Sequence, residues 1–168
     1  MILAKRLLLA LFLPAIFFAP VAAEPQNKSA PQIDVPVEFK EAKIVFNLDH
    51  LAFTGDQLTG LAHMNSILAS YKAAKVPVHI VAVFHGLAGY IVLNDAAYNS
   101  TRKSWHGNPF KDQIQALQKD GVQFELCVNT AKANGWLNAD LLPGVKVNSG
   151  ANLRIIQLVQ DGYVQMHP

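Results

Sequence analysis

Short apolar runs rich in β-branched residues recur along this chain and alternate with segments of helical periodicity. The clearest run is 76–84, VPVHIVAVF, with Pro77 near its start. A nearly continuous run of this kind is typical of a strand covered on both faces of a sheet, with the proline where its missing donor does least harm. Shorter runs at 42–48, 122–128, 145–147 and 163–166 predict further strands.

Helical patterns occupy the spaces between these runs. Segment 56–75 has one apolar face, and a second helix starts at Asn108-Pro109 and ends at Gly121. A short helical piece ends near Gly135, and a last helix covers 152–160. This alternation predicts an α/β fold with an open, mostly parallel sheet and helices on its faces.

The first 23 residues predict a secretory signal peptide. A basic pair at positions 5 and 6 precedes an apolar stretch, and small residues end the segment at Ala23. The apolar stretch is shorter than the roughly 20 residues of a membrane span, and two prolines interrupt it. We therefore expect export to the periplasm with cleavage near Ala23 and no stable membrane anchor. An uncleaved anchor is the alternative.

Charge and length describe what remains after cleavage. Residues 24–40, rich in Pro, Gln, Asn and Ser, predict a flexible leader, and 41–168 have the size of one domain. The chain has 14 Lys and Arg against 12 Asp and Glu, and the basic pair of the signal accounts for the difference. The mature chain is thus formally neutral and has no basic stripe, so we expect no nucleic-acid partner.

Three predicted strands end in residues that carry chemistry. Ligands of open parallel sheets bind beyond the carboxyl ends of the strands. The segments that leave those ends are Asp49-His50, His85-Gly86 and 127–130, so we expect them to meet at one edge of the sheet.

Cys127 is the only cysteine, and a lone thiol in an exported protein is buried, paired with another chain, or reactive. It lies just before Asn129-Thr130, which can open a helix, and a helix N-terminus favours the thiolate. We interpret Cys127 as an accessible, reactive thiol rather than a core residue.

The other candidate residues surround this thiol. His50 and His85 are the candidate partners of the Cys127 thiolate. Candidate binding residues are Asn47, Asp49, Gly86 and Asn129, with turn or cap duty as the alternative. Two histidines and one cysteine also form a copper or zinc ligand set. No short ligand spacing accompanies them, so the predicted site contains no metal.

The remaining histidines and tryptophans have ordinary interpretations. His63 and His79 fall inside a helix and a strand, which predicts packing, and His106 falls in the polar loop 99–108. Trp105 and Trp136 flank loops and could wall a pocket or cover a subunit contact. The chain contains no dinucleotide fingerprint, phosphate loop or nucleophile elbow, so no cofactor is expected.

Six short segments, taken in order, resemble the DsrE/DsrF-like sulfur-relay family in its small exported branch. They are KIVFNL (43–48), HG (85–86), FELCVNT (124–130), LLPGV (141–145), SG (149–150) and DGY (161–163). The resemblance covers about 40–168 and implies a flavodoxin-like α/β fold and a homo-oligomer, commonly a trimer or hexamer. In characterised members a cysteine accepts sulfur as a persulfide and passes it on, and Cys127 matches that position. Those members work in the cytoplasm with partner proteins, whereas this chain is predicted to be exported.

These observations predict a periplasmic sulfur carrier, sulfurtransferase-like, with Cys127 as the persulfide acceptor. Its partners would be itself and a sulfur donor or acceptor, either a protein or a small sulfur compound. The alternative is a non-catalytic oligomeric module that binds a small ligand or metal, with Cys127 only lining the pocket. A third hypothesis is an interaction protein that keeps the fold and has lost the chemistry.

Overall fold

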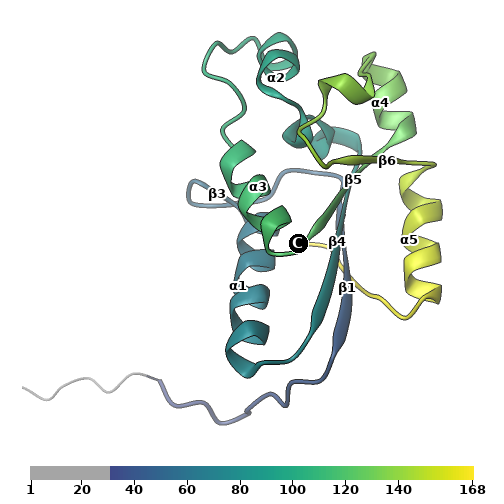
Figure 1. The fold of residues 1–168 in the computed structure, drawn as a ribbon. Coiled ribbons are helices and arrows are strands. Elements are labelled where there is room, and N and C mark those ends of the chain that lie inside the picture. The colour runs from purple at the N-terminus through teal and green to yellow at the C-terminus, as the bar shows by residue number, and fades with distance from the viewer. Residues whose placement is uncertain (1–30) are drawn as a thin grey trace, which may run out of the picture. The chain divides into compact units, whose positions relative to one another are not determined.

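A five-stranded parallel sheet forms the centre of the molecule (Figure 1). Its strand order is β6-β5-β4-β1-β7. The strands are β1 (Ala42–Leu48), β4 (Val78–Phe84), β5 (Gln123–Cys127), β6 (Lys146–Asn148) and β7 (Val164–Met166). The predicted α/β fold with a mostly parallel sheet is therefore confirmed, and each predicted strand run overlaps a strand.

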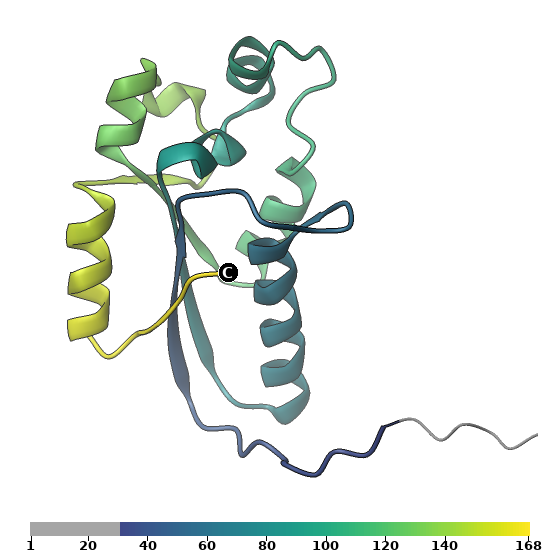
Figure 2. The same cartoon turned by 180° about the vertical axis from the view of Figure 1, so that it is seen from behind.

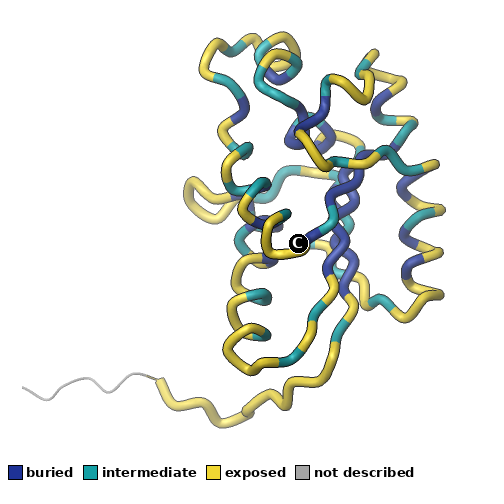
Figure 3. Tube along the Cα trace, viewed as in Figure 1, coloured by how far each residue is buried: buried dark blue, intermediate teal, exposed yellow. Residues whose placement is uncertain are grey.

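The apolar run at 76–84 became the middle strand, β4, because it is covered on both sides. Ile80 to Phe84 are all buried, with β1 and β5 as neighbours. The buried residues gather along these central strands (Figure 3). The two edge strands are three residues long, and such short edges offer little backbone for unwanted pairing.

Helices cover the two faces unequally. Helices α1 (Thr59–Ala74) and α3 (Lys111–Lys119) lie on one face, where Phe46, Phe84 and Phe124 belong to the larger apolar cluster. Helix α5 (Ala151–Gln160) lies on the other face (Figures 1 and 2). There Ile155 and Leu158 belong to a smaller cluster with valines of β1 and β4.

Segment 86–102 is more helical than the sequence suggested. A 3-10 helix, η1 (Gly86–Val92), follows β4, and helix α2 (Asp95–Arg102) enters the stretch expected to be a loop. Asn94 caps α2, because its side-chain oxygen accepts a hydrogen bond from the Ala97 N–H. The loop expectation for residues 99–102 was thus wrong.

The remaining elements are short. They are the hairpin of β2 (Phe53–Thr54) and β3 (Gln57–Leu58), helix α4 (Val128–Asn134) and the 3-10 helix η2 (Asn138–Asp140). Helix α1 begins at Thr59, later than predicted, because β3 occupies the residues before it.

The computed structural model describes residues 31–168, and Val37–Pro168 form one compact unit. Residues 31–36, the described part of the other unit, are exposed and contain no helix or strand. The predicted signal peptide, 1–23, and residues 24–30 of the predicted leader lie outside the described residues. None of the helices within 31–168 has the length and apolar character needed to cross a membrane.

Candidate functional site

Cys127 lies where a strand passes directly into a helix. It is the last residue of β5 and the N-cap of α4, and its backbone is still extended, with φ −62° and ψ 127°. Its sulfur also accepts a hydrogen bond from the N–H of Ala151, the first residue of α5, at 3.3 Å. The thiol is therefore close to the N-terminal ends of two helices, which favour negative charge.

These surroundings act on the pKa of Cys127 in opposite directions. Burial raises the pKa, because it disfavours the charged thiolate. Backbone N–H groups of Thr130, Ala151 and Asn129 and the Thr130 hydroxyl lower it by donating hydrogen bonds to the sulfur. The hydrogen bonds outweigh burial, so the pKa of Cys127 lies below its ordinary value.

A pocket of about 470 Å³ opens beside the thiol. His85 after β4, Asn129 and Thr130 of α4, and residues 149–153 at the start of α5 line it together with Cys127. Cys127 itself is only 5 % exposed and packs in the smaller apolar cluster. The thiol is therefore less accessible than the sequence analysis expected, and a reagent must reach it through this pocket.

A buried ion pair holds α5 against β5 next to the thiol. The Glu125 side chain is 3 % exposed, and its carboxylate accepts hydrogen bonds from Arg154 Nε at 3.0 Å and from the Arg154 terminal nitrogen at 2.9 Å. Asn148 of β6 donates a further bond at 3.1 Å. Charge-assisted, multiply bonded contacts of this kind fix geometry, and this one fixes the helix end that faces Cys127.

His85 joins the pocket but pairs with Asn47. Its Nε2 lies 2.7 Å from Asn47 Oδ1, across the ends of β4 and β1. Burial lowers the pKa of His85, with a smaller opposing influence from Asp49 and a lowering one from His167. A lowered pKa favours the neutral imidazole, and hence a hydrogen-bonding role for His85 over a charged one.

Gly86 connects the two histidine segments. Its N–H donates to Thr130 Oγ1 at 3.0 Å, and its φ of 54° lies in the left-handed region. A Cβ here would come within 2.9 Å of the Asp49 carbonyl oxygen. Only glycine fits this close approach without a shift of backbone.

His50 and Asp49 lie in a separate cluster. His50 Nδ1 is 2.5 Å from Asp49 Oδ1, and His167 Nε2 is 2.9 Å from the same oxygen. Hydrogen bonds from His167 and His50, in that order, lower the pKa of Asp49 to about 2. Within residues 31–168, no hydrogen bond links Cys127 to His50 or to His85, so the proposed pairing stays a prediction.

His167 was missed by the sequence analysis although a signal for it existed. It directly follows β7, just as Asp49 and His85 directly follow β1 and β4. Functional residues gather at the carboxyl ends of parallel strands. The same rule, used for the last strand, points to His167.

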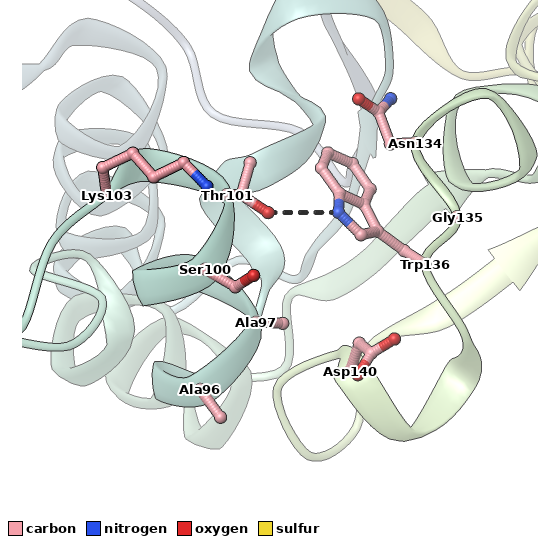
Figure 4. A pocket seen from close by; sticks show the side chains of 9 residues that line it. All are labelled: Ala96, Ala97, Ser100, Thr101, Lys103, Asn134, Gly135, Trp136 and Asp140. Carbon is pink, nitrogen blue, oxygen red and sulfur yellow. Dashed lines mark hydrogen bonds between the residues drawn. The ribbon is translucent and has the colours of Figure 1, made fainter.

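The other aromatic and histidine predictions have mixed outcomes. Trp136 lines a pocket of about 590 Å³ between α2 and η2, where its indole N–H donates to Thr101 Oγ1 at 3.2 Å (Figure 4). Its lining includes no cysteine and no histidine, and it is separate from the pocket beside Cys127. Trp105 is 81 % exposed, and His106 is exposed, as expected of a loop residue. His63 and His79 are exposed rather than packed, because both lie on outward-facing positions of their elements.

Comparisons with known proteins give the family. The sequence profile of the DsrE/DsrF-like family matches residues 40–168. A protein of unknown function from Methanobacterium thermoautotrophicum, MTH1491, has a similar structure, with 22 % identity and a TM-score of 0.55 over 76 % of this chain and 99 % of its own. The ychN protein of E. coli is also similar, with 15 % identity and a TM-score of 0.51 over the same shares. A search of curated proteins finds no match. Since the family profile spans most of the chain, this protein belongs to the DsrE/DsrF-like family.

Proposed function

We propose that this protein is an exported sulfur carrier in which Cys127 accepts sulfane sulfur as a persulfide and passes it to an acceptor. The observation that carries the proposal is the set of hydrogen-bond donors around the sulfur, which lowers the pKa of a lone cysteine beside a pocket. The thiolate is the form that attacks a sulfur–sulfur bond. Membership of the DsrE/DsrF-like family supports a sulfur-relay role.

The chemistry needs only thiolates and persulfides. The Cys127 thiolate attacks the outer sulfur of a donor persulfide, R–S–SH. A new sulfur–sulfur bond forms, the donor's sulfur–sulfur bond breaks, and the donor leaves as the thiolate R–S⁻ with the electron pair. In the second half, an acceptor thiolate attacks the outer sulfur of the Cys127 persulfide and releases the Cys127 thiolate. The same N–H donors stabilise the Cys127 thiolate as attacking group and as leaving group.

The polar residues of the pocket have supporting roles in this proposal. Asn129 and Thr130 stabilise the thiolate through their N–H groups, and Thr130 adds its hydroxyl. Asn47 orients His85, whose neutral ring faces the pocket as a hydrogen-bonding group rather than as a charge. Gly86 keeps the His85 segment in contact with Thr130.

The experiment is intact-mass analysis of tag-free protein incubated with inorganic polysulfide and then freed of excess reagent. We expect one added sulfur atom per chain, located on Cys127 and removed by a thiol reductant. Cys127→Ser, shown to be folded by circular dichroism, should gain nothing. A wild-type protein that keeps its mass while a small reference thiol is persulfidated would refute the carrier role.

The burial of Cys127 favours one competing function, a binding module in which the thiol only lines the pocket. Cys127 is 5 % exposed and contacts an apolar cluster. In that case iodoacetamide should label Cys127 only after unfolding, and a small ligand should raise the melting temperature without modifying the thiol.

Export to the periplasm is part of the proposal and has its own test. The basic pair, the apolar stretch and the small residues before Glu24 motivate it. In a Gram-negative host the mature protein should begin at or near Glu24 and appear in the periplasmic fraction. Full-length protein retained in the cytoplasm would contradict export and leave the thiol chemistry to be judged on its own.

A further inference from the structure

Asp49, His50 and His167 form a compact cluster of metal-ligating side chains apart from the Cys127 pocket lining. One ligand atom from each lies within 4.8 Å of the other two. Both imidazoles point a ring nitrogen at the same carboxylate oxygen, at 2.5 Å and 2.9 Å. The two rings stand at 89° with centroids 5.1 Å apart, so they approach the carboxylate from different directions.

The backbone holds these three residues in place from both sides. The Asp49 carbonyl oxygen accepts hydrogen bonds from Leu87 N–H at 2.9 Å and Ala88 N–H at 3.3 Å. On the other side, β7 pairs with β1 in a register that aligns Met166 with Phe46, which brings His167 beside the end of β1. The side chains are 40–50 % exposed, so an ion has access from solvent.

We propose that Asp49, His50 and His167 bind one divalent transition-metal ion, with Zn²⁺ as the representative. Two imidazoles and one carboxylate are common ligands of zinc and related metals. Without a metal, these three exposed, hydrogen-bonded side chains would contribute little to the free energy of folding.

Binding requires only small movements of exposed side chains. Ligand atoms around a tetrahedral Zn²⁺ lie about 2.0–2.2 Å from the metal, and hence farther apart than the present hydrogen-bonded contacts. A metal-bound imidazole has its proton on the other ring nitrogen, so in each histidine the nitrogen that faces Asp49 would donate its lone pair to the metal. Three protein ligands leave at least one coordination position for water or an exchangeable ligand.

The test uses tag-free mature protein, stripped with a chelator and titrated with Zn²⁺ by calorimetry and by competition with a chromophoric indicator. We expect one ion per chain. His50→Ala and His167→Ala should each weaken binding by at least about tenfold. Removal of the last two residues, which leaves β7 intact, should weaken it equally, and circular dichroism should show all variants folded.

Two variants serve as controls. His79→Ala is the matched one, because His79 is also an exposed histidine beside a carboxylate, with Nε2 3.6 Å from Glu41. It should bind Zn²⁺ like the wild type. Cys127→Ser should also bind Zn²⁺ like the wild type, because the Cys127 sulfur is not one of the three proposed ligands.

Electron paramagnetic resonance of the Cu²⁺-loaded protein gives an independent signature. The wild type should show coupling to two imidazole nitrogens, and His167→Ala to one. The proposal is overturned if Zn²⁺ does not bind, if binding survives both histidine substitutions, or if it is lost in Cys127→Ser instead.

Discussion

Cys127 owes its lowered pKa to neighbours that are themselves fixed by the backbone. Three of the donors that lower its pKa are main-chain N–H groups at the starts of α4 and α5, and one is the Thr130 hydroxyl. Main-chain donors survive most substitutions, so the hydroxyl is the donor that mutagenesis can remove, together with the bond it accepts from the Gly86 N–H.

The first prediction concerns the pH dependence of alkylation. Because the pKa of Cys127 is lowered, the thiolate, and with it the rate of reaction with iodoacetamide, should reach half its maximum below about pH 8.5, the ordinary cysteine value. Rates measured by mass spectrometry between pH 5 and pH 10 (roughly the window a cysteine titration needs) locate this midpoint. Urea-unfolded protein supplies the control at the ordinary value. A native midpoint at or above the unfolded one would mean that burial outweighs the hydrogen bonds in setting the pKa of Cys127.

The second prediction concerns the Thr130 hydroxyl. Thr130→Val should raise the pKa of Cys127 towards its ordinary value, because the sulfur loses one donor. Valine keeps a methyl group where the Thr130 methyl contacts the Gly89 region. Thr101→Val is the control, since the Thr101 hydroxyl partners Trp136 instead. The alkylation midpoint should move in the first variant only.

At the residue scale, sequence placed the candidates at the correct sheet edge but could not pair them. Ligands bind at the carboxyl ends of parallel strands, and this rule correctly places His85 and Asn129 beside Cys127. It also places Asn47 beside His85, and Gly86 beside Thr130. It could not show that His50 points at Asp49, because that depends on side-chain direction and on His167, 117 residues away from His50 in the chain.

At the element scale, α5 depends on Glu125 and Arg154 for its position. The helix has no side-chain cap at its start, where Gly150 is the N-cap. The ion pair between Glu125 and Arg154 therefore fixes the first turns of α5 against β5, the strand that carries Cys127. A side-chain cap would not do this.

The third prediction tests this anchor. Arg154→Met should lower the free energy of unfolding by about 3 kcal/mol, because it leaves the buried Glu125 carboxylate without its cation. It should also raise the pKa of Cys127 by loosening the Ala151 N–H contact. Urea titration and the alkylation midpoint measure the two effects.

A surface arginine provides the control for this experiment. Arg102 lies over the Tyr90 ring at 4.3 Å, so Arg102→Met should cost only about 1 kcal/mol or less and leave the thiol unchanged. Equal losses in both variants would show that the Glu125 pair has no special role.

Strong periodicity decided which elements the sequence could predict. The strands and helices α1, α3 and α5 each have one recognisable apolar pattern. The 3-10 helix η1 has none, because Ala88, Gly89, Ile91 and Val92 are buried on all sides. Helix α2 buries only Tyr98, so its pattern is too weak to be seen.

At the scale of the whole molecule, the sheet is covered unequally. Among the described helices, α1 and α3 cover one face, whereas α5 lies alone over the other (Figures 1 and 2). Parallel sheets are ordinarily buried on both faces. Leu153, Ile156 and Val159 point outward from α5 and are 66 %, 55 % and 46 % exposed.

The fourth prediction is that the mature chain forms a homo-oligomer, a trimer or hexamer, through this outer side of α5. The exposed apolar side chains of α5 form a surface suited to burial against a second copy of the chain. Light scattering should give a mass well above one subunit, and moderate salt should not reduce it, because residues 24–168 are formally neutral and the contact is apolar.

A pair of charge-introducing variants decides where the contact lies. Ile156→Asp should lower the measured mass towards one subunit, because an unpaired carboxylate in an apolar interface is costly to bury. Leu137→Asp, at a residue 70 % exposed in another part of the surface, should leave the mass unchanged. A monomeric wild type would contradict assembly, and a mass that falls in Leu137→Asp alone would move the interface away from α5. Since Leu153 also lines the Cys127 pocket, dissociation in Ile156→Asp should in addition change the rate at which the thiol is alkylated.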